Sequence, residues 1–299
     1  MMNYQNVLEK YPWLIEPRQN VILSYDTDGW VTGVLLAEIL DWKIVGYYDS
    51  ERLILKNGVR TDDCVFIDVE IFRSAKKSFG HHLIIYDFNN LPNDFAARTT
   101  NCFNPNFYRR FDKRSSYTRK YPLATFHLFD KILRQSGVGS IDLTSEAALS
   151  VVWFIDGLMN IRYKYAPNVT EWISFLQMQN ESWYLEMNRR GEARVKALAA
   201  EFINAVNQVG DYSAMKRLQN FTPATLTNLI ALISEKLGVE NKIDNWCRSD
   251  YSTILFNRQF TDIVTQIDFN TFWNQNPFSM STYFRNQISF TLEEPQLLP

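Results

Sequence analysis

Four aspartates stand beside apolar segments of the chain, where folding could bring their carboxylates together. Asp26 and Asp28 follow the run NVILSY, Asp68 closes the run CVFID, and Asp156 lies in the segment SVVWFIDGLM. Carboxylate oxygens are the ligands that Mg²⁺ and Mn²⁺ prefer. Two such ions about 3.5 to 4 Å apart can activate a water and hold a phosphoryl group for in-line displacement. The four residues therefore predict a divalent-metal site that acts on a phosphate ester.

The spacing in Asp26-Thr27-Asp28-Gly29 fits this chemistry. Alternate residues of a turn can present one carboxylate to each of two ions, and Gly29 lets the backbone approach a phosphate. Acidic residues after strands are also frequent helix N-caps and solvated turn residues. For this tetrapeptide alone, capping is the more frequent of the two roles.

The first 90 residues alternate short apolar runs with helical patterns, after an amphipathic helix within residues 1–20. We predict a helix over residues 30–40. We predict buried strands over residues 20–25, 43–48, 64–68 and 83–86. Strands that are apolar on both faces and separated by helices indicate a parallel sheet with right-handed crossovers. Ligands bind at the carboxyl ends of such strands. The predicted fold class is therefore α/β, with the acidic residues at one edge of the sheet.

From about residue 121 the pattern becomes helical. We predict helices over 121–135, 143–165, 181–209 and 223–237, and a strand pair within 279–292. Pro167 disfavours helical geometry in the residue before it, so the long helix over 143–165 should end there. We therefore predict two domains, residues 1–166 and a mainly helical lobe over residues 167–299.

Five segments appear in an order that resembles the DHH phosphoesterases. They are ILSYDTDGWVTGVLLAEIL, VFIDVEI, LIIYDFNNLP, NCFNPNFYRRFDKRSSYTRKYPLATFHLFDKIL and SVVWFIDGLM, and together they span roughly residues 20 to 165. The superfamily contains RecJ-type single-strand exonucleases, oligoribonuclease-like and cyclic-dinucleotide phosphodiesterases, and family II pyrophosphatases. The resemblance is RecJ-like, and it implies a parallel-sheet domain with helices on both faces.

The resemblance also implies roles for individual residues. Asp28, Asp68 and Asp156 would hold the principal Mn²⁺ or Mg²⁺ ion, and Asp26 would assist. Asp68 would be the metal-bridging residue of the second motif, and an ion-bound hydroxide would be the nucleophile.

The third motif departs from the family. Where members have Asp-His-His, this chain has Asp87-Phe88-Asn89. Phe88 cannot ligate a metal, whereas Asn89 can donate a hydrogen bond to a phosphate oxygen. We therefore expect one firm ion, with a second ion weak or absent, and assign Asn89 a catalytic role together with Asp68.

The neighbouring pair His81-His82 offers another third motif, Gly-His-His. Both residues precede the run LIIY. At the amino end of that predicted strand they would lie about 13 Å from its carboxyl end. We expect solvated turn or helix-end histidines there, and a packed helix histidine at His127.

Residues 108–120 form a basic segment, in which six basic residues and one acid give a net charge of +5. Interleaved aromatic residues could stack on bases. We predict a phosphate- or nucleic-acid-binding set that consists of Gly29, Asp87, Asn89, Arg109, Arg110, Lys113 and Arg114. A solvated surface loop is the alternative.

Composition limits the other possibilities. The net charge of −2 excludes a global field that attracts polyanions, and three widely spaced cysteines disfavour both a disulfide framework and a thiolate zinc site. The first 20 residues lack the apolar stretch of a signal peptide, and no run reaches the length of a membrane span. We therefore expect a cytoplasmic protein without a membrane partner.

The second half lacks the glycine-rich phosphate-gripping turn that family members carry in a C-terminal lobe. That lobe could instead be a substrate clamp, a platform for a protein partner, or an interface between copies of this chain. We expect its tryptophans to be core residues, namely Trp172, Trp183, Trp246 and Trp273.

Two hypotheses follow. The first is a metal-dependent phosphodiesterase that cleaves single-stranded nucleic acid or a small nucleotide. The second is a catalytically impaired DHH-fold protein that binds nucleic acid or a protein partner.

Overall fold

The computed structural model describes residues 1–114 and 116–292, which form two compact units. The first unit contains Met1–Gln19, Tyr25–Ile44 and Pro122–Arg248, and the second contains Asn20–Ser24, Val45–Tyr121 and the chain from Ser249 onward. The units therefore differ from the predicted division at residue 166. The physical reason is that strands from both ends of the chain complete the sheet of the second unit, while helices from both halves pack together in the first.

The second unit is built on a sheet that runs in the order β6-β5-β4-β1-β2-β3-β7. The pairs β1–β4, β4–β5 and β5–β6 are parallel, and the pairs β2–β3 and β3–β7 are antiparallel. The strands are β1 (Asn20–Ser24), β2 (Lys43–Tyr48), β3 (Arg52–Lys56), β4 (Cys64–Ile67), β5 (Lys77–Phe79), β6 (Cys102–Phe103) and β7 (Tyr251–Leu255). The α/β class and three of the predicted strands are confirmed.

The fourth predicted strand is wrong, because residues 83–86 join no sheet. The next parallel strand beside β4 is instead β5, which ends just before Gly80. Leu83 and Ile85 are nevertheless fully buried, in an apolar cluster with Phe95, Trp273 and Phe290. The apolar run therefore serves a core without contributing to the sheet.

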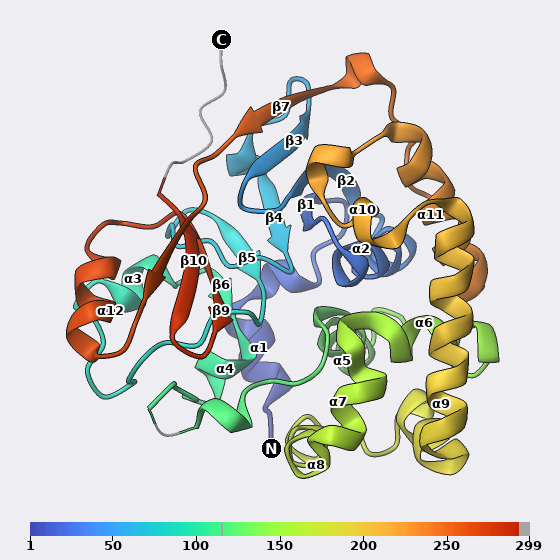
Figure 1. Ribbon diagram of the computed structural model, residues 1–299, viewed down its shortest axis with the longest axis horizontal. Helices are drawn as coiled ribbons and strands as arrows, with labels where there is room; N and C mark the ends of the chain where they lie inside the picture. Colours follow the sequence, from blue (N-terminus) through green and yellow to red (C-terminus); the bar gives the residue numbers. More distant parts are fainter. Residues whose placement is uncertain (115, 293–299) are drawn as a thin grey trace. The chain divides into compact units, whose positions relative to one another are not determined.

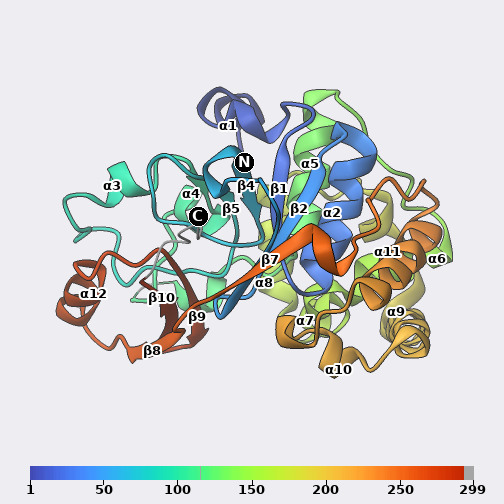
Figure 2. The same ribbon diagram turned by 90° about the horizontal axis from the view of Figure 1, so that it is seen from above.

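A smaller antiparallel sheet, in the order β8-β10-β9, lies beside α12 in the second unit (Figure 2). Its strands β9 (Ser279–Phe284) and β10 (Gln287–Thr291) confirm the predicted strand pair. The remaining elements of this unit are β8 (Gln259–Asp262), α3 (Phe95–Arg98), α4 (Pro105–Tyr108), α12 (Gln266–Trp273) and the 3₁₀ turns η2 (Thr61–Asp63) and η3 (Tyr117–Arg119); η6 (Arg248–Asp250) stands at the boundary.

The first unit is helical, and α9 runs alongside α6 and α11 (Figure 1). Its helices are α1 (Tyr4–Lys10), α2 (Thr27–Leu40), α5 (Thr125–Ser136), α6 (Glu146–Phe154), α7 (Leu158–Lys164), α8 (Ala166–Phe175), α9 (Ser182–Val209), α10 (Tyr212–Met215) and α11 (Pro223–Leu237), with 3₁₀ turns η1 (Pro12–Leu14), η4 (Ile155–Gly157) and η5 (Leu218–Asn220). The predicted helices over 30–40 and 223–237 are confirmed. The helix predicted over 181–209 is present as α9, but it is kinked at Gly191, which has a φ of 75°.

The predicted helix over residues 143–165 is broken in its middle. Asp156 has a φ of 51° and Gly157 a φ of 68°, so the chain leaves helical geometry between α6 and α7. Pro167 lies in the first turn of α8, a position where its missing N–H costs nothing. Proline therefore begins a new helix here. None of the helices within 1–114 and 116–292 combines the length and apolar character needed to cross a bilayer.

Candidate metal centre

Asp68 follows the last residue of β4 and is the centre of a buried polar cluster. Its side chain is fully buried, and its backbone takes a left-handed conformation with a φ of 62°. Ser24, at the end of the neighbouring strand β1, donates a hydrogen bond of 2.7 Å from its Oγ to Asp68 Oδ2. The backbone N–H of Asp68 donates to the carbonyl of Phe79 at 2.6 Å. Strained backbone held in this way is frequent at functional sites.

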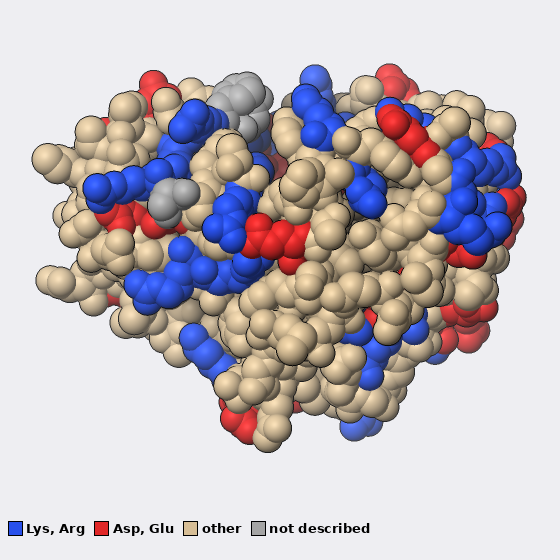
Figure 3. Space-filling model, turned by 90° about the horizontal axis from the view of Figure 1, so that it is seen from below, with Lys and Arg blue, Asp and Glu red and all other residues tan. Residues whose placement is uncertain are grey.

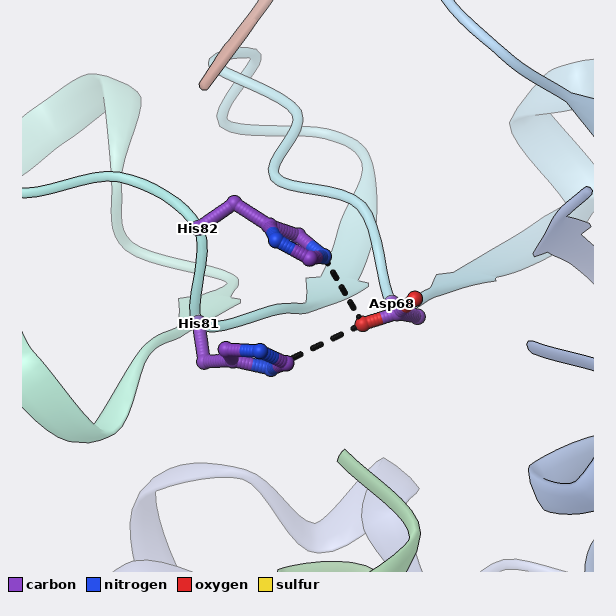
Figure 4. A group of neighbouring side chains, drawn as sticks. All are labelled: Asp68, His81 and His82. Atoms are coloured by element: carbon purple, nitrogen blue, oxygen red, sulfur yellow. Dashed lines mark hydrogen bonds and ion pairs between the residues drawn. The ribbon is translucent and has the colours of Figure 1, made fainter. Parts of the chain in front are cut away.

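His81 and His82 follow β5, the strand beside β4, and both imidazoles point toward Asp68 (Figure 4). His82 Nε2 lies 2.9 Å from Asp68 Oδ1, and His81 Nδ1 lies 3.6 Å from the same oxygen. One ligand atom from each residue lies within 4.8 Å of the others. The expectation of solvated turn or helix-end histidines at the amino end of a strand is therefore wrong, because it depended on a strand over residues 83–86.

The histidines stabilise the charged form of Asp68. Burial raises the pKa of Asp68, but the charge and hydrogen bond of His82, together with His81 and Ser24, outweigh burial and hold the pKa below its usual range. The carboxylate is therefore ionised. The His82 side chain is 32% exposed, whereas that of His81 is 9% exposed, so the cluster opens to solvent on one side.

The donor set of one carboxylate and two imidazoles fits a divalent ion. Imidazole nitrogen suits Fe²⁺ or Zn²⁺, whereas Mn²⁺ and Mg²⁺ prefer oxygen, and of these two Mn²⁺ accepts nitrogen more readily. Asp68, His81 and His82 would hold the ion, with the remaining positions open to water or substrate.

Asp26 and Asp28 lie in the first unit and serve as helix caps. Asp26 is the N-cap of α2, and its carboxylate accepts a hydrogen bond of 3.1 Å from the backbone N–H of Gly29. Buried Asp28 accepts bonds from the backbone N–H groups of Thr125 at 2.6 Å and Phe126 at 3.0 Å. Thr125 and Phe126 are the first two residues of α5. The N-cap residue of this helix, Ala124, has no polar side chain that could accept their N–H groups. The capping role that is common for such aspartates is therefore present at both positions.

Asp156 is exposed at the break between α6 and α7, also in the first unit. Tyr212 of α10 lies near it, with its hydroxyl 2.6 Å from Thr27 Oγ1. Burial, together with the charges of Asp26 and Asp156, raises the pKa of Tyr212 to about 12, although the hydrogen bond with Thr27 acts in the opposite direction. Tyr212 was missed in the sequence, where nothing in its surroundings distinguishes it from a core tyrosine.

The four predicted metal-binding aspartates are thus divided between the units. Asp26, Asp28 and Asp156 belong to the first, and Asp68 belongs to the second. Their convergence on one ion stays a prediction. Within the second unit, the imidazoles of His81 and His82 lie next to Asp68.

Asp87 and Asn89 form a closed turn in the second unit. Asp87 is buried and accepts hydrogen bonds from Asn89 N–H at 2.8 Å, from Asn90 at 2.9 Å and from the Arg114 guanidinium at 2.7 Å. The bond from Asn89 and that from Arg114 lower the pKa of Asp87. Their predicted roles at a phosphate stay predictions.

The basic segment combines guanidinium groups with aromatic rings. The Arg109 and Arg119 guanidinium carbons lie 4.2 Å and 4.9 Å from the Phe111 ring centre, and Arg110 lies 5.4 Å from that of Phe88. Arg110, Arg119 and Arg114 are exposed. Figure 3 shows Lys and Arg side chains gathered on the side where Figure 1 places α4 and the loop after it.

Lys113 departs from its predicted role as a ligand-binding residue. It is only 6% exposed, and its Nζ donates a 2.8 Å hydrogen bond to the carbonyl of Ile263. Burial lowers its pKa to about 8. Lys113 thus ties the segment to the protein interior, because its stem packs inward.

His127 and the four tryptophans match the expectation of core residues. His127 is buried; its Nδ1 accepts from the backbone N–H of Ala124, and its Nε2 lies 3.1 Å from the carbonyl oxygen of Val152. The four tryptophans predicted to be core residues are all buried.

Comparisons of the chain with protein-family models, curated protein sequences and solved structures found no match.

Proposed function

We propose that this protein is a divalent-metal-dependent phosphodiesterase whose ion is held by Asp68, His81 and His82. The observation that carries the proposal is the approach of two imidazoles to one buried, ionised carboxylate at the ends of adjacent parallel strands. Strand ends are where sheets of this kind bind ligands. Gly80, His81 and His82 also follow a parallel strand, β5, and in the DHH phosphoesterases the histidine-bearing third motif likewise follows a strand.

The donor set favours Mn²⁺ over Mg²⁺ because two of its three ligands are nitrogen. A bound ion would supply Lewis acidity and an activated water for attack on phosphorus. Ser24 holds Asp68 Oδ2, which leaves Oδ1 facing the two imidazoles. The chain's own contribution is therefore a carboxylate with one oxygen already satisfied and the other directed to the ion.

We propose single-stranded nucleic acid or a small nucleotide as the substrate. The support is the basic segment, in which exposed arginines lie against aromatic rings, an arrangement suited to phosphates and unstacked bases. Arg110 and Arg119 are its exposed members over Phe88 and Phe111.

The test is cleavage of labelled single-stranded oligonucleotides and cyclic dinucleotides by purified protein with Mn²⁺, Mg²⁺ or Zn²⁺, and with EDTA. We expect cleavage with Mn²⁺ that is lost in EDTA, in Asp68→Asn and in His82→Ala. Asp63→Asn, which neutralises an exposed carboxylate just before β4, is the matched control and should cleave like wild type. Wild-type cleavage no greater than that of Asp68→Asn would overturn the proposal.

A catalytically impaired binding protein is the second candidate. The observation that favours it is the use of Asp26 and Asp28 as helix caps, which occupies carboxylate oxygens that a catalytic centre would need. This candidate requires salt-sensitive binding of oligonucleotides that survives EDTA and Asp68→Asn. Binding that disappears with the metal would exclude it.

A further inference from the structure

The segment that carries His81 and His82 is not itself a strand of either sheet. Residues 81–86 lie outside the sheet, yet Leu83, Ile84 and Ile85 are fully buried. Buried N–H and C=O groups are costly unless they are hydrogen-bonded. The groups of His81, Leu83 and their neighbours must therefore be satisfied by other parts of the second unit.

Glu70 satisfies the first of these groups. It is 1% exposed, and its Oε1 accepts hydrogen bonds from the Leu83 N–H at 2.9 Å and from the Asn104 side-chain amide at 2.7 Å. A Cβ at position 80 would lie only 2.7 Å from the Glu70 carboxyl carbon. Gly80 therefore leaves room for this carboxyl beside the histidine segment.

The Asn104-Pro105-Asn106 sequence satisfies the carbonyl groups. The Asn104 side-chain amide donates to the Leu83 carbonyl at 3.1 Å, and that of Asn106 donates to the His81 carbonyl at 3.0 Å. The two asparagines are joined by a 2.8 Å bond from Asn106 N–H to Asn104 Oδ1. Asn106 Oδ1 also accepts from the N–H of Tyr121, whose ring centre lies 5.3 Å from that of His81.

The other side of the segment is held by β9. Thr282 donates from its backbone N–H to the His82 carbonyl at 3.1 Å and accepts from the Ile84 N–H at 3.0 Å with its hydroxyl. The backbone from His81 to Ile84 is thus bonded on both sides, so its position depends on three buried side chains and one strand.

We propose that Glu70, Asn104 and Asn106 are positioning residues that fix the backbone of His81 to Leu83 so that both imidazoles reach Asp68. None of the three contacts the ion directly in this proposal. The effect of these three residues on metal affinity rests on the proposed function, whereas their effect on the positions of the two imidazole rings does not. Residues that orient metal ligands typically affect metal affinity by about 10- to 100-fold when they are replaced.

The sharpest variant is Asn106→Asp. It keeps an oxygen that accepts from Tyr121 N–H, and it replaces the amide that donates to the His81 carbonyl by a carboxylate oxygen, which cannot donate and carries negative charge. Asn101→Asp is the matched control, because Asn101 makes the same kind of bond, to the Ser74 carbonyl at 2.7 Å, in the same unit. Glu70→Ala removes the acceptor for Leu83, and Glu70→Gln keeps one.

The first readout is the imidazole NMR spectrum of the metal-free protein. The chain has three histidines, so three sets of signals are expected, and His127 in the first unit is an internal reference. We expect the His81 and His82 signals to shift in Asn106→Asp and Glu70→Ala, while His127 stays unchanged. Glu70→Gln should restore the wild-type signals, and Asn101→Asp should leave all three in place. Unshifted His81 and His82 signals in both disruptive variants would overturn the inference.

The second readout is Mn²⁺ affinity, measured from the electron paramagnetic resonance signal of free Mn²⁺. We expect Asn106→Asp and Glu70→Ala to bind about 10- to 100-fold more weakly than wild type, with Glu70→Gln and Asn101→Asp near wild type. If wild type binds Mn²⁺ and the disruptive variants bind it equally well, the inference fails. If wild type binds no Mn²⁺, the proposed function fails, and the imidazole spectra still decide the positioning role.

Discussion

Asp68 and Asp28 are both buried aspartates, and their partners give them different uses. Asp28 accepts hydrogen bonds from two backbone N–H groups and from the Thr32 hydroxyl, so both of its oxygens are occupied by the protein. Asp68 accepts a hydrogen bond from the Ser24 hydroxyl with Oδ2, and its Oδ1 faces the imidazoles of His81 and His82. A metal ion can replace imidazole protons, whereas it cannot replace the N–H groups of a helix start without unpairing them.

A third buried aspartate, Asp130 of α5, makes stability depend on pH. Its Oδ2 accepts from Arg134 at 2.7 Å, and its Oδ1 has no hydrogen-bond partner among the described residues. Burial raises its pKa to about 6. The folded state therefore binds the proton more tightly than the unfolded chain, so this residue's contribution to stability is present below about pH 4 and is lost as pH rises through about 6.

We expect Asp130→Asn to remove this dependence. Above pH 6 the variant should be more stable than wild type, by up to about 2 to 3 kcal/mol, because no buried charge remains. Near pH 4 the two should be equally stable. Urea unfolding at pH 4 and pH 8 measures the difference, and a gap of the same size at both pH values would contradict the assignment.

At the scale of elements, three long periodic helices were predicted, whereas the break between α6 and α7 and the short strand β5 were not. Three helices repeat apolar residues over ten or more positions, so their burial is evident in the sequence. In contrast, β5 has three residues and begins with Lys77, which gives no period to detect. The apolar run over 83–86 resembles a strand in the sequence, because burial in a core and burial in a sheet leave the same composition.

That single error also displaced the candidate site. Placing a strand after His81 and His82 put them at its amino end, whereas β5 before them puts them at a carboxyl end. Asp68 was identified correctly as a residue at the end of a parallel strand, since β4 is apolar throughout. The roles of Glu70 and Asn106 could not be predicted, because they depend on backbone groups that a regular strand would have satisfied.

Tyr212 links α10 to the first turn of α2 through Thr27. We expect Tyr212→Phe and Thr27→Val each to lower the free energy of unfolding by about 0.5 to 1.5 kcal/mol, the usual value of one hydrogen bond. Because both lose the same bond, the double variant should cost less than the sum of the single ones. A double-mutant cycle by urea unfolding measures this, and additive effects would show that the hydroxyl pair contributes no coupling.

The basic segment contains both exposed and inward-facing cations, and this makes a selective prediction. We expect Arg110→Ala and Arg119→Ala to weaken binding of a single-stranded oligonucleotide and to reduce its salt dependence, because each loses a cation near phosphate. Lys113→Met should bind as wild type does, since Lys113 already donates to Ile263. Fluorescence anisotropy at several salt concentrations tests both statements. Equal losses in all three variants would mean that net charge alone governs binding.

At the scale of the whole molecule, the chain crosses between its two units several times. The segment Asn20–Ser24 belongs to the sheet unit while the residues on either side of it belong to the helical unit, and β7 returns to the sheet from the far end of the chain. A single boundary could not be placed from the sequence because composition changes along the chain, whereas the units are assembled from distant segments. The acidic motifs are distributed accordingly, with Asp68 and both histidines in one unit.

This distribution predicts where metal binding should stabilise the protein. Ligand at 100 times its dissociation constant adds about 2.7 kcal/mol to the stability of whatever region must stay folded to bind it. We therefore expect saturating Mn²⁺ to slow amide hydrogen exchange in residues 66–72 and 77–85, which carry Asp68, His81 and the backbone that holds them. The effect should disappear with EDTA and in Asp68→Asn. Slowed exchange also at residues 26–33 and 155–158 is what the predicted convergence of all four aspartates requires, whereas unchanged exchange around Asp68 would contradict a metal centre there altogether.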